Sequence, residues 1–384
     1  MKRSTSFVLV ALAVVAAMSF TTLAAAQRVS TDERTALFAS APRVQTKVPG
    51  VTVFAAPPKG FNPLAATNRE LLSYGLPQPP DKTVDALGYQ HWARAMAALK
   101  TTPNDVKALP YSSTNMRSSG SAPTANISGT PSFTTSGNWS GIANTNHNTR
   151  WSNLTSFDEV VSFFSVPVAN HPFGNLPCTE GPWLEVTWNG IDGFSNGDVV
   201  QGGSFEEWDD GGCGGPVSYI GWVEWFPSYS ILQINCGSSA CPVGPGDDFE
   251  VVTFGVAGTA EQSVFVEDIT QQWGGTFGLT WLTGPGLVGS SAEYIVERPC
   301  CNGPNLYPLA NYVYEPMFSN YAYDGHGTLF YPGSASPFTY IITMLADDGS
   351  DISYPAIYGT AGNSGRYSVT MADEGCAFSG GCTP

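Results

Sequence analysis

The sequence contains no lysine after residue 107, and few cations of any kind follow that point. Residues 131–384 carry three arginines and 26 acidic residues, a net charge of −23, whereas the first 130 residues carry 13 basic and 6 acidic residues, a net of +7. Nucleic-acid binding is therefore disfavoured, because a polyanion needs Lys and Arg to displace its counterions. A strongly negative domain repels itself at neutral pH. We expect it to work in an acidic medium; an ordinary soluble extracellular protein is the alternative.

Cysteine is absent from the first 177 residues, and all eight cysteines lie between positions 178 and 382. An even number of cysteines in a secreted chain is typical of disulfides formed in an oxidising compartment. Their short spacings predict bridges between Cys236 and Cys241 and between Cys376 and Cys382. A zinc site is the alternative, but the sequence has no C-x-x-C pair and no H-E-x-x-H. We predict no metal and no cofactor.

Long apolar segments are missing, apart from one near the first residue. Lys2 and Arg3 precede an apolar run over 7–20, and small alanines follow over 24–26. This order is typical of a secretory signal peptide, predicted here over residues 1–26. The run is shorter than the roughly 20 apolar residues that span a bilayer; an uncleaved membrane anchor is the alternative. We predict a secreted, extracellular protein with no membrane contact after cleavage.

The rest of the chain divides by composition into three parts. Residues 27–110 form a predicted prosegment with helices over 68–74 and 84–100, where helix formers and helical apolar spacing occur. Residues 111–136, rich in Ser, Thr, Gly and Pro, form a predicted linker with a processing site. Residues 137–384 alternate short runs of β-branched and aromatic residues with turn residues. They predict an all-β mature domain, a sandwich or barrel.

The sequence motifs of the common hydrolase mechanisms are also absent. The predicted mature domain has no G-x-S-x-G motif and neither Asp-Thr-Gly nor Asp-Ser-Gly, and its three histidines are His147, His171 and His326. A serine or cysteine nucleophile needs a base beside it. We expect these histidines to be loop or surface residues instead. Catalysis in this domain would therefore fall to carboxylates and amides.

Four motifs follow one another along the predicted mature domain. They are N-W-S-G from Asn138, W-N-G-I-D-G from Trp188 with Gln201 downstream, E-W-F-P from Glu224, and A-E-Y-I-V-E from Ala292. Their order, spacing and content together resemble the glutamic peptidases, or eqolisins. The resemblance covers residues 137 to about 345, most of the mature region. Each motif alone would be a weak signal, whereas the combination is specific.

The resemblance implies an antiparallel β-sandwich of the concanavalin-like or jelly-roll type, with a substrate cleft across one curved sheet. It implies that Gln201 and Glu293 form the catalytic dyad. It also implies supporting or substrate-binding roles near the cleft for Trp139, Trp188, Asp192, Glu224 and Trp225; a core or scaffold position is the alternative for each of them. From the residues themselves, the two glycines after Gln201 suggest a turn at a strand end. Alternation along the strand places Glu293, Ile295 and Glu297 on one face.

This pair of side chains suits peptide hydrolysis in acid. Such a reaction needs a base for water, an acid for the leaving amine and donors for the oxyanion. Glu293 can act first as base and then as acid, since a glutamate has an unperturbed pKa of about 4.3. Gln201 does not titrate, so it can orient water and stabilise the oxyanion at low pH. The sequence thus predicts an acid endopeptidase, made as a zymogen, that acts on proteins or peptides.

Two other functions remain open on the sequence alone. A lectin-like sandwich would use its Trp and Tyr residues to bind sugars, and a glycoside hydrolase would use paired carboxylates such as Glu224 and Glu293. The predicted partners are the substrate and the chain's own prosegment, acting as an intramolecular inhibitor; a monomer is expected. The opposite charges of prosegment and mature domain further suggest an electrostatic latch, which covers the cleft at neutral pH and weakens as carboxylates are protonated.

Overall fold

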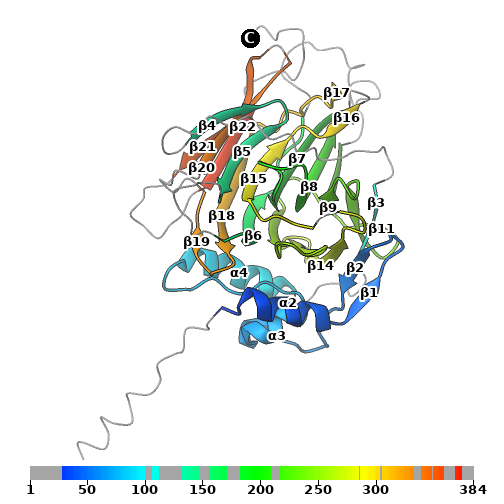
Figure 1. Cartoon of the computed structure of the whole chain (residues 1–384). Helices are drawn as coiled ribbons and strands as arrows, with labels where there is room; N and C mark the ends of the chain where they lie inside the picture. Colours follow the sequence, from blue (N-terminus) through cyan, green and yellow to red (C-terminus); the bar gives the residue numbers. More distant parts are fainter. Residues whose placement is uncertain are drawn as a thin grey trace, which may run out of the picture.

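A computed structural model of the chain describes residues 28–99, 106–111, 132–146, 155–170, 182–208, 217–284, 286–302, 305–332, 339–347, 349–358 and 368–373. These residues form two large β-sheets that pack face to face, with three helices along one side (Figure 1). The pairing is antiparallel except between β4 and β20. The predicted all-β sandwich is therefore confirmed, and no helix within the described ranges is long and apolar enough to cross a membrane.

The first sheet runs in the order β4, β20, β5, β15, β7, β8, β9, β10, β3, and β11 forms a hairpin with β10. Its strands are β3 (Val106–Pro110), β4 (Ser132–Ser136), β5 (Trp139–Thr145), β7 (Trp183–Ile191), β8 (Val199–Trp208), β9 (Val217–Phe226), β10 (Leu232–Cys236), β11 (Ser239–Ala240), β15 (Ser291–Glu297) and β20 (Thr339–Leu345). Strand β4 covers residues that the sequence assigned to the end of the linker.

The second sheet runs in the order β21, β22, β18, β6, β12, β13, β14, β2, β1, with β19 paired to β18 and β21 joined to β20 of the first sheet. Its strands are β1 (Arg43–Gln45), β2 (Val51–Phe54), β6 (Phe157–Ser165), β12 (Asp248–Phe254), β13 (Glu261–Asp268), β14 (Trp273–Thr280), β18 (Tyr314–Asp324), β19 (Leu329–Phe330), β21 (Asp351–Tyr358) and β22 (Ser368–Asp373). Strands β16 (Cys300–Asn302) and β17 (Asn305–Leu306) form a separate pair.

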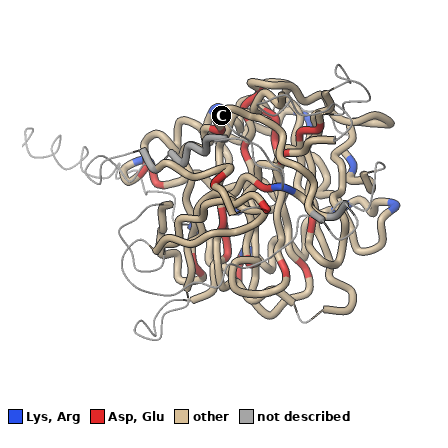
Figure 2. The backbone as a smooth tube through the Cα atoms, turned by 90° about the horizontal axis from the view of Figure 1, so that it is seen from above, with Lys and Arg blue, Asp and Glu red and all other residues tan. Residues whose placement is uncertain are grey.

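Apolar side chains fill the space between the two sheets. Val200 and Tyr294 from the first sheet meet Phe164, Phe249 and Val251 from the second in one buried cluster. These residues alternate along their strands with others that face outward, which is the pattern the sequence runs predicted. Acidic residues greatly outnumber basic ones across this sandwich (Figure 2).

The predicted prosegment is more structured than its sequence suggested. Helices α3 (Asn68–Leu72) and α4 (Ala86–Ala98) confirm the two predicted helices, while α2 (Thr31–Ser40), the short helix η1 (Pro63–Ala65) and strands β1, β2 and β3 were not anticipated. Side chains at the helix starts satisfy free backbone N–H groups. Thr67 forms a capping box with Glu70, and Asp85 accepts a bond of 2.8 Å from the Gly88 N–H.

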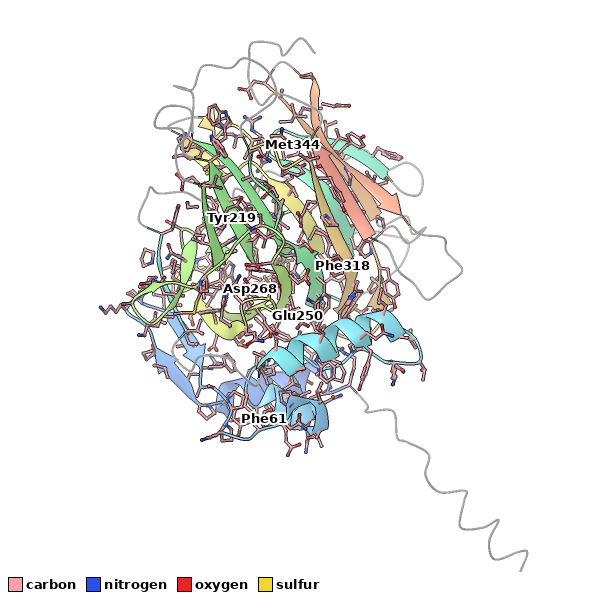
Figure 3. The ribbon with its side chains drawn as sticks, turned by 180° about the vertical axis from the view of Figure 1, so that it is seen from behind. Phe61, Tyr219, Glu250, Asp268, Phe318 and Met344 are labelled. Atoms are coloured by element: carbon pink, nitrogen blue, oxygen red, sulfur yellow. A yellow bond between two sulfur atoms is a disulfide. The ribbon has the colours of Figure 1, made fainter. Side chains whose placement is uncertain are left out.

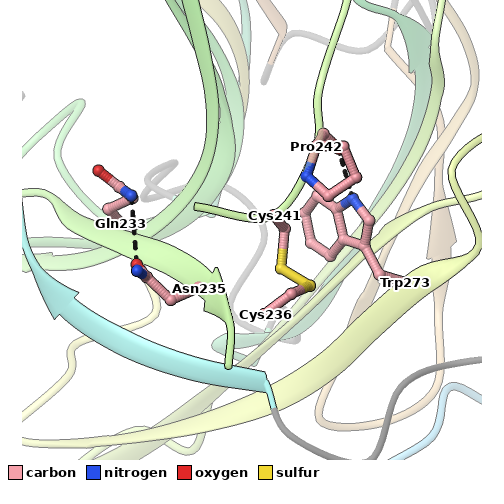
Figure 4. The surroundings of a disulfide bond; sticks show 6 residues. All are labelled: Gln233, Asn235, Cys236, Cys241, Pro242 and Trp273. Atoms are coloured by element: carbon pink, nitrogen blue, oxygen red, sulfur yellow. Dashed lines mark hydrogen bonds between the residues drawn. A yellow bond between two sulfur atoms is a disulfide. The ribbon is translucent and has the colours of Figure 1, made fainter. Parts of the chain in front are cut away.

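A disulfide joins Cys236 and Cys241 at the tip of the β10–β11 hairpin, beside Trp273 (Figure 4). This bridge is the one that the short spacing predicted. Cys300 is also disulfide-bonded. The predicted Cys376–Cys382 bridge lies outside the described residues, as does the predicted signal peptide over 1–26.

Candidate active site

Five residues on neighbouring strands of the first sheet stand directly opposite one another. In spatial order they are Ala143, Glu293, Gly190, Gln201 and Glu224. Directly paired residues project from the same face of a sheet. Glu293 and Gln201 are therefore on one face, two strands and roughly 10 Å apart at their Cα atoms. We call this set the dyad row and the face from which it projects the dyad face.

Gly190, between the two members of the predicted dyad, contributes no side chain. A Cβ atom at this position would lie 2.9 Å from the Val200 carbonyl oxygen and 3.0 Å from side-chain atoms of Trp188 and Val199. The glycine in the W-N-G-I-D-G motif thus allows Trp188 and β8 to pack closely at this point of the dyad row.

Gln201 lies within β8, paired on both sides, and not at a strand-end turn as its following glycines suggested. Those glycines serve close packing instead: a Cβ at Gly203 would lie 1.8 Å from the Thr187 carbonyl oxygen. The Gln201 side chain is fully buried, and its Nε2 donates a hydrogen bond of 2.9 Å to Glu224 Oε2. This bond places the side-chain nitrogen of Gln201 on the side of Glu224.

Glu293 is the third residue of β15, and its side chain is also fully buried. Burial raises its pKa well above the usual range of a glutamate, and the negative charges of Asp192 and Asp198 act in the same direction. The Ser291 side chain and the Phe194 N–H lower this pKa and offset part of the shift.

Asp192 fixes the segment that leads into β15. This residue has a positive φ of 70°, and its carboxylate accepts N–H bonds of 2.8, 2.7 and 2.7 Å from Val288, Gly289 and Ser290. The Ser290 hydroxyl donates a further bond of 2.8 Å. Because Glu293 follows Ser290 by three residues, Asp192 positions the predicted base through the backbone.

Trp139 and Trp188 lie on the dyad face, with their rings 5.2 Å apart in an edge-to-face contact. Trp188 Nε1 donates a bond of 2.9 Å to Glu297, which also accepts a bond of 3.2 Å from Asn138. Glu293, Ile295 and Glu297 share this face, as alternation predicted. Trp225 does not belong here: it is paired with Val200 and packs in the core between the sheets.

Two residues near Glu293 were missed from the sequence. Asp198 precedes β8, and burial followed by the charge of Asp192 raises its pKa to about 6. Phe194, in the β7–β8 loop, packs against Tyr340 with ring centroids 4.7 Å apart. Neither belongs to a recognisable motif, so only the fold could reveal them. A cavity of about 1160 Å³ lies elsewhere, under the predicted prosegment, and neither member of the predicted dyad lines it.

The sequence matches the Peptidase A4 family over residues 137–348, more than half of its 384 residues. The chain belongs to this family, the glutamic peptidases, and is thus a peptide hydrolase that acts on proteins or peptides. No curated protein matches the sequence.

Solved structures of glutamic peptidases also resemble the fold. Scytalido-glutamic peptidase with a transition state analog inhibitor is 20% identical, covering 62% of this chain and 98% of its own, with a TM-score of 0.46. SCP-B, an eqolisin in complex with the tripeptide Ala-Ile-His, is 18% identical with the same coverage and a TM-score of 0.44. Aspergilloglutamic peptidase from Aspergillus niger is 23% identical, covering 50% of this chain and 99% of its own, with a TM-score of 0.40.

Proposed function

We propose that this peptidase is a secreted acid endopeptidase, made as a zymogen, that uses Gln201 and Glu293 as its dyad. The observation that carries the proposal is the dyad row, in which both side chains project from one face with only Gly190 between them. The predicted signal peptide supports secretion, and the scarcity of cations after residue 131 supports work in acid. A monomer remains the expectation.

In the proposed reaction, the Glu293 carboxylate takes a proton from water while the oxygen of that water attacks the scissile carbonyl carbon. One N–H of the Gln201 amide is held by Glu224, and the amide's other N–H would donate to the oxyanion that forms. Protonated Glu293 then gives its proton to the amine as the C–N bond breaks. The products are a carboxylic acid and an amine, and Glu293 is a carboxylate again.

The dyad row gives less support to a glycoside hydrolase. Glu224 and Glu293 are three strands apart, about 14 Å between Cα atoms, and Gln201 stands between them. Glu224 is also engaged with the Gln201 amide, which suits a positioning role.

The simplest test is the hydrolysis of a denatured protein. We expect the folded, processed chain to digest it at pH 3.5 and to lose activity as the pH rises to 7. A sugar-binding protein would show no proteolysis at any pH but would retain glycans in a binding screen. Absence of proteolysis from folded, processed protein at pH 3 to 5 would refute the proposal.

The end of the predicted prosegment packs against the first sheet. We call residues 106–111, which end the predicted prosegment and include the first residue of the predicted linker, the prosegment arm. Its strand β3 extends the first sheet beside β10. Tyr111 packs against Phe205 with the two rings tilted and their centroids 5.3 Å apart, and its hydroxyl donates to Glu207. Phe205 and Glu207 lie an even number of residues from Gln201 along β8, so their side chains project from the dyad face as well. Tyr111, which contacts both, therefore covers part of this face. We propose that the arm contributes to inhibition of the zymogen.

Replacing Tyr111 with alanine should therefore raise the activity of the uncut precursor on a short peptide at pH 3.5, by about 10-fold for a loss of about 1.4 kcal/mol. Lys107→Ala, a change at an exposed position of the same arm, should leave that activity unchanged. Equal activities of the Tyr111→Ala and wild-type precursors would show that Tyr111 does not restrain the enzyme.

A further inference from the structure

The outer face of the second sheet carries a continuous apolar surface from the predicted mature domain. Its buried members come from β6, β12, β13 and β18 and from the turn after β13. They are Val161, Phe163, Val252, Phe254, Phe265, Ile269, Tyr321 and Tyr323. The five aromatic rings alone represent on the order of 1000 Å² of surface. A soluble protein rarely exposes an apolar patch of that size, and where it does the patch marks a binding site.

Residues 28–99, which we call the prosegment body, cover this surface (Figure 1). Phe38 from α2 packs edge-to-face against Phe254, with ring centroids 5.2 Å apart, and Trp92 and Met96 from α4 join the same buried cluster. In Figure 3 helix α4 runs beneath Glu250 and Phe318 of the second sheet. The described body therefore docks on the sheet opposite the dyad face, not over the cleft as the latch hypothesis supposed.

The body also completes the core between the two sheets. Strand β2 pairs with β14 at the edge of the second sheet, and its Val51 and Val53 enter the central cluster beside Phe277 and Leu279. A side-chain hydrogen bond adds to this contact: the Thr276 hydroxyl donates a bond of 2.8 Å to the Gly75 carbonyl. Removing the body would thus uncover one end of the sandwich core as well as its outer face.

Arginines of the body reach buried carboxylates of the second sheet. Arg34 lies 3.1 Å from Asp158 and 3.4 Å from Glu159, and its guanidinium also donates to the carbonyl oxygens of Asp158 and Gly255, at 2.9 and 3.2 Å. Arg28 pairs with Glu159 and stacks 3.6 Å over the Tyr323 ring. Breaking a buried ion pair leaves an uncompensated charge and is costly, so these contacts oppose separation.

We propose that the prosegment body stays bound to the second sheet after the linker is cut, so that the working peptidase consists of two chains. The body would be a lasting structural part, and only the arm, held by the β3–β10 pairing, would need to leave the dyad sheet. The proposal goes beyond the peptidase function and does not depend on it.

Acid should preserve this association. The titratable and charged groups at the interface are Asp158, Glu159, Asp248, Glu250, Glu261, Glu267, Tyr321 and Tyr323 on the sheet and Arg28, Arg34, Arg43, Asp85, His91 and Arg94 on the body. Burial raises the pKa of Glu250 and Glu267 well above the usual range, and the charges that act on them are other carboxylates. Even beside Arg34, burial keeps the pKa of Asp158 raised. Protonation of these carboxyl groups thus favours the docked state. This is the opposite of the latch hypothesis, in which acid weakens the attraction to the prosegment.

The test separates cleavage from activity. A recognition sequence for an added site-specific protease is placed within residues 112–131 of a full-length Glu293→Gln chain, and the cut protein is run on a size-exclusion column at pH 3.5 and pH 7. We expect both fragments in one peak at equal amounts at pH 3.5. A separate small fragment at pH 3.5 would overturn the proposal, even if it stays bound at pH 7. A dimer of the large fragment without the body would also overturn it.

Matched variants show whether the contacts described hold the body. In the cut protein, Trp92→Ala should weaken retention by about 100-fold or more, since truncating a buried Trp costs roughly 3 to 5 kcal/mol. Met96→Ala is a milder variant for use if Trp92→Ala does not fold. Gln90→Ala, at an exposed position of α4, should retain the body like the parent chain. Equal retention in Trp92→Ala and Gln90→Ala would count against this interface.

Discussion

At pH 7 the folded chain should unfold at a distinctly lower urea concentration than at pH 4, the reverse of most proteins. The cause is a set of carboxyl groups buried between the two sheets. Glu185 and Glu206 are directly paired on β7 and β8, and Glu315 approaches them from β18. All three are fully buried. Burial raises the pKa of Glu206 well above its usual range, and the charge of Glu185 raises it further.

The sign of the effect follows from proton binding. A carboxyl with a raised pKa in the folded state binds its proton more tightly there than in the unfolded chain. Its contribution to stability is fully present below the unfolded pKa of about 4.3 and is lost as the pH rises through the folded pKa. Asp268, whose pKa burial raises to about 8, adds to this loss. Stability should thus fall between about pH 4 and pH 8.

Glu206→Gln isolates this effect, because glutamine resembles a protonated glutamate and cannot ionise. At pH 4 the substitution should change the free energy of unfolding little. At pH 7 it should raise that free energy by on the order of 2 kcal/mol, as measured by chemical denaturation. Asp351→Asn, at an exposed position of β21, serves as the control and should change neither value. A pH-independent unfolding midpoint in the wild type, or no gain for Glu206→Gln at pH 7, would contradict this account. Loss of the fold would also explain an upper pH limit on activity.

The sequence allowed the sandwich and the strand of Glu293 to be predicted, because alternation within Ser291–Glu297 matches the register of β15. Gln201 was predicted as a site residue but placed wrongly, because glycines needed for close strand packing look like turn glycines in a sequence. The sequence left open whether Trp225 lies near the cleft or in the core. The structure places it in the core, because a one-residue offset from Glu224 turns a side chain to the opposite face of the sheet.

The place of the prosegment could not be predicted from the sequence. Its β2 and β3 add to edges of two different sheets, and such long-range pairings leave no local signal in short, isolated runs. Net charge correctly suggested attraction between the prosegment and the mature domain. It could not show that the contacts would fall on the sheet opposite the dyad face.

Substitutions in the dyad should have the largest effects on activity. Glu293→Gln removes the group proposed to act as both base and acid, and kcat/KM should fall by about 10³-fold or more. Gln201→Ala removes an oxyanion donor and should cost about 10²- to 10³-fold. Glu224→Gln keeps a hydrogen-bonding partner for Gln201 and should cost less than either. A glycoside hydrolase would instead be as sensitive to Glu224→Gln as to Glu293→Gln.

The most direct test of the proposed dyad compares two buried glutamates in one assay. The value of kcat/KM for peptide hydrolysis at pH 3.5 is measured for processed wild type, Glu293→Gln and Glu315→Gln, each shown to be folded. Glu315 is as buried as Glu293 but lies on the second sheet, so its substitution controls for the loss of a buried carboxyl group. We predict that activity is lost in Glu293→Gln and retained in Glu315→Gln. Wild-type activity in a folded Glu293→Gln protein would contradict the dyad.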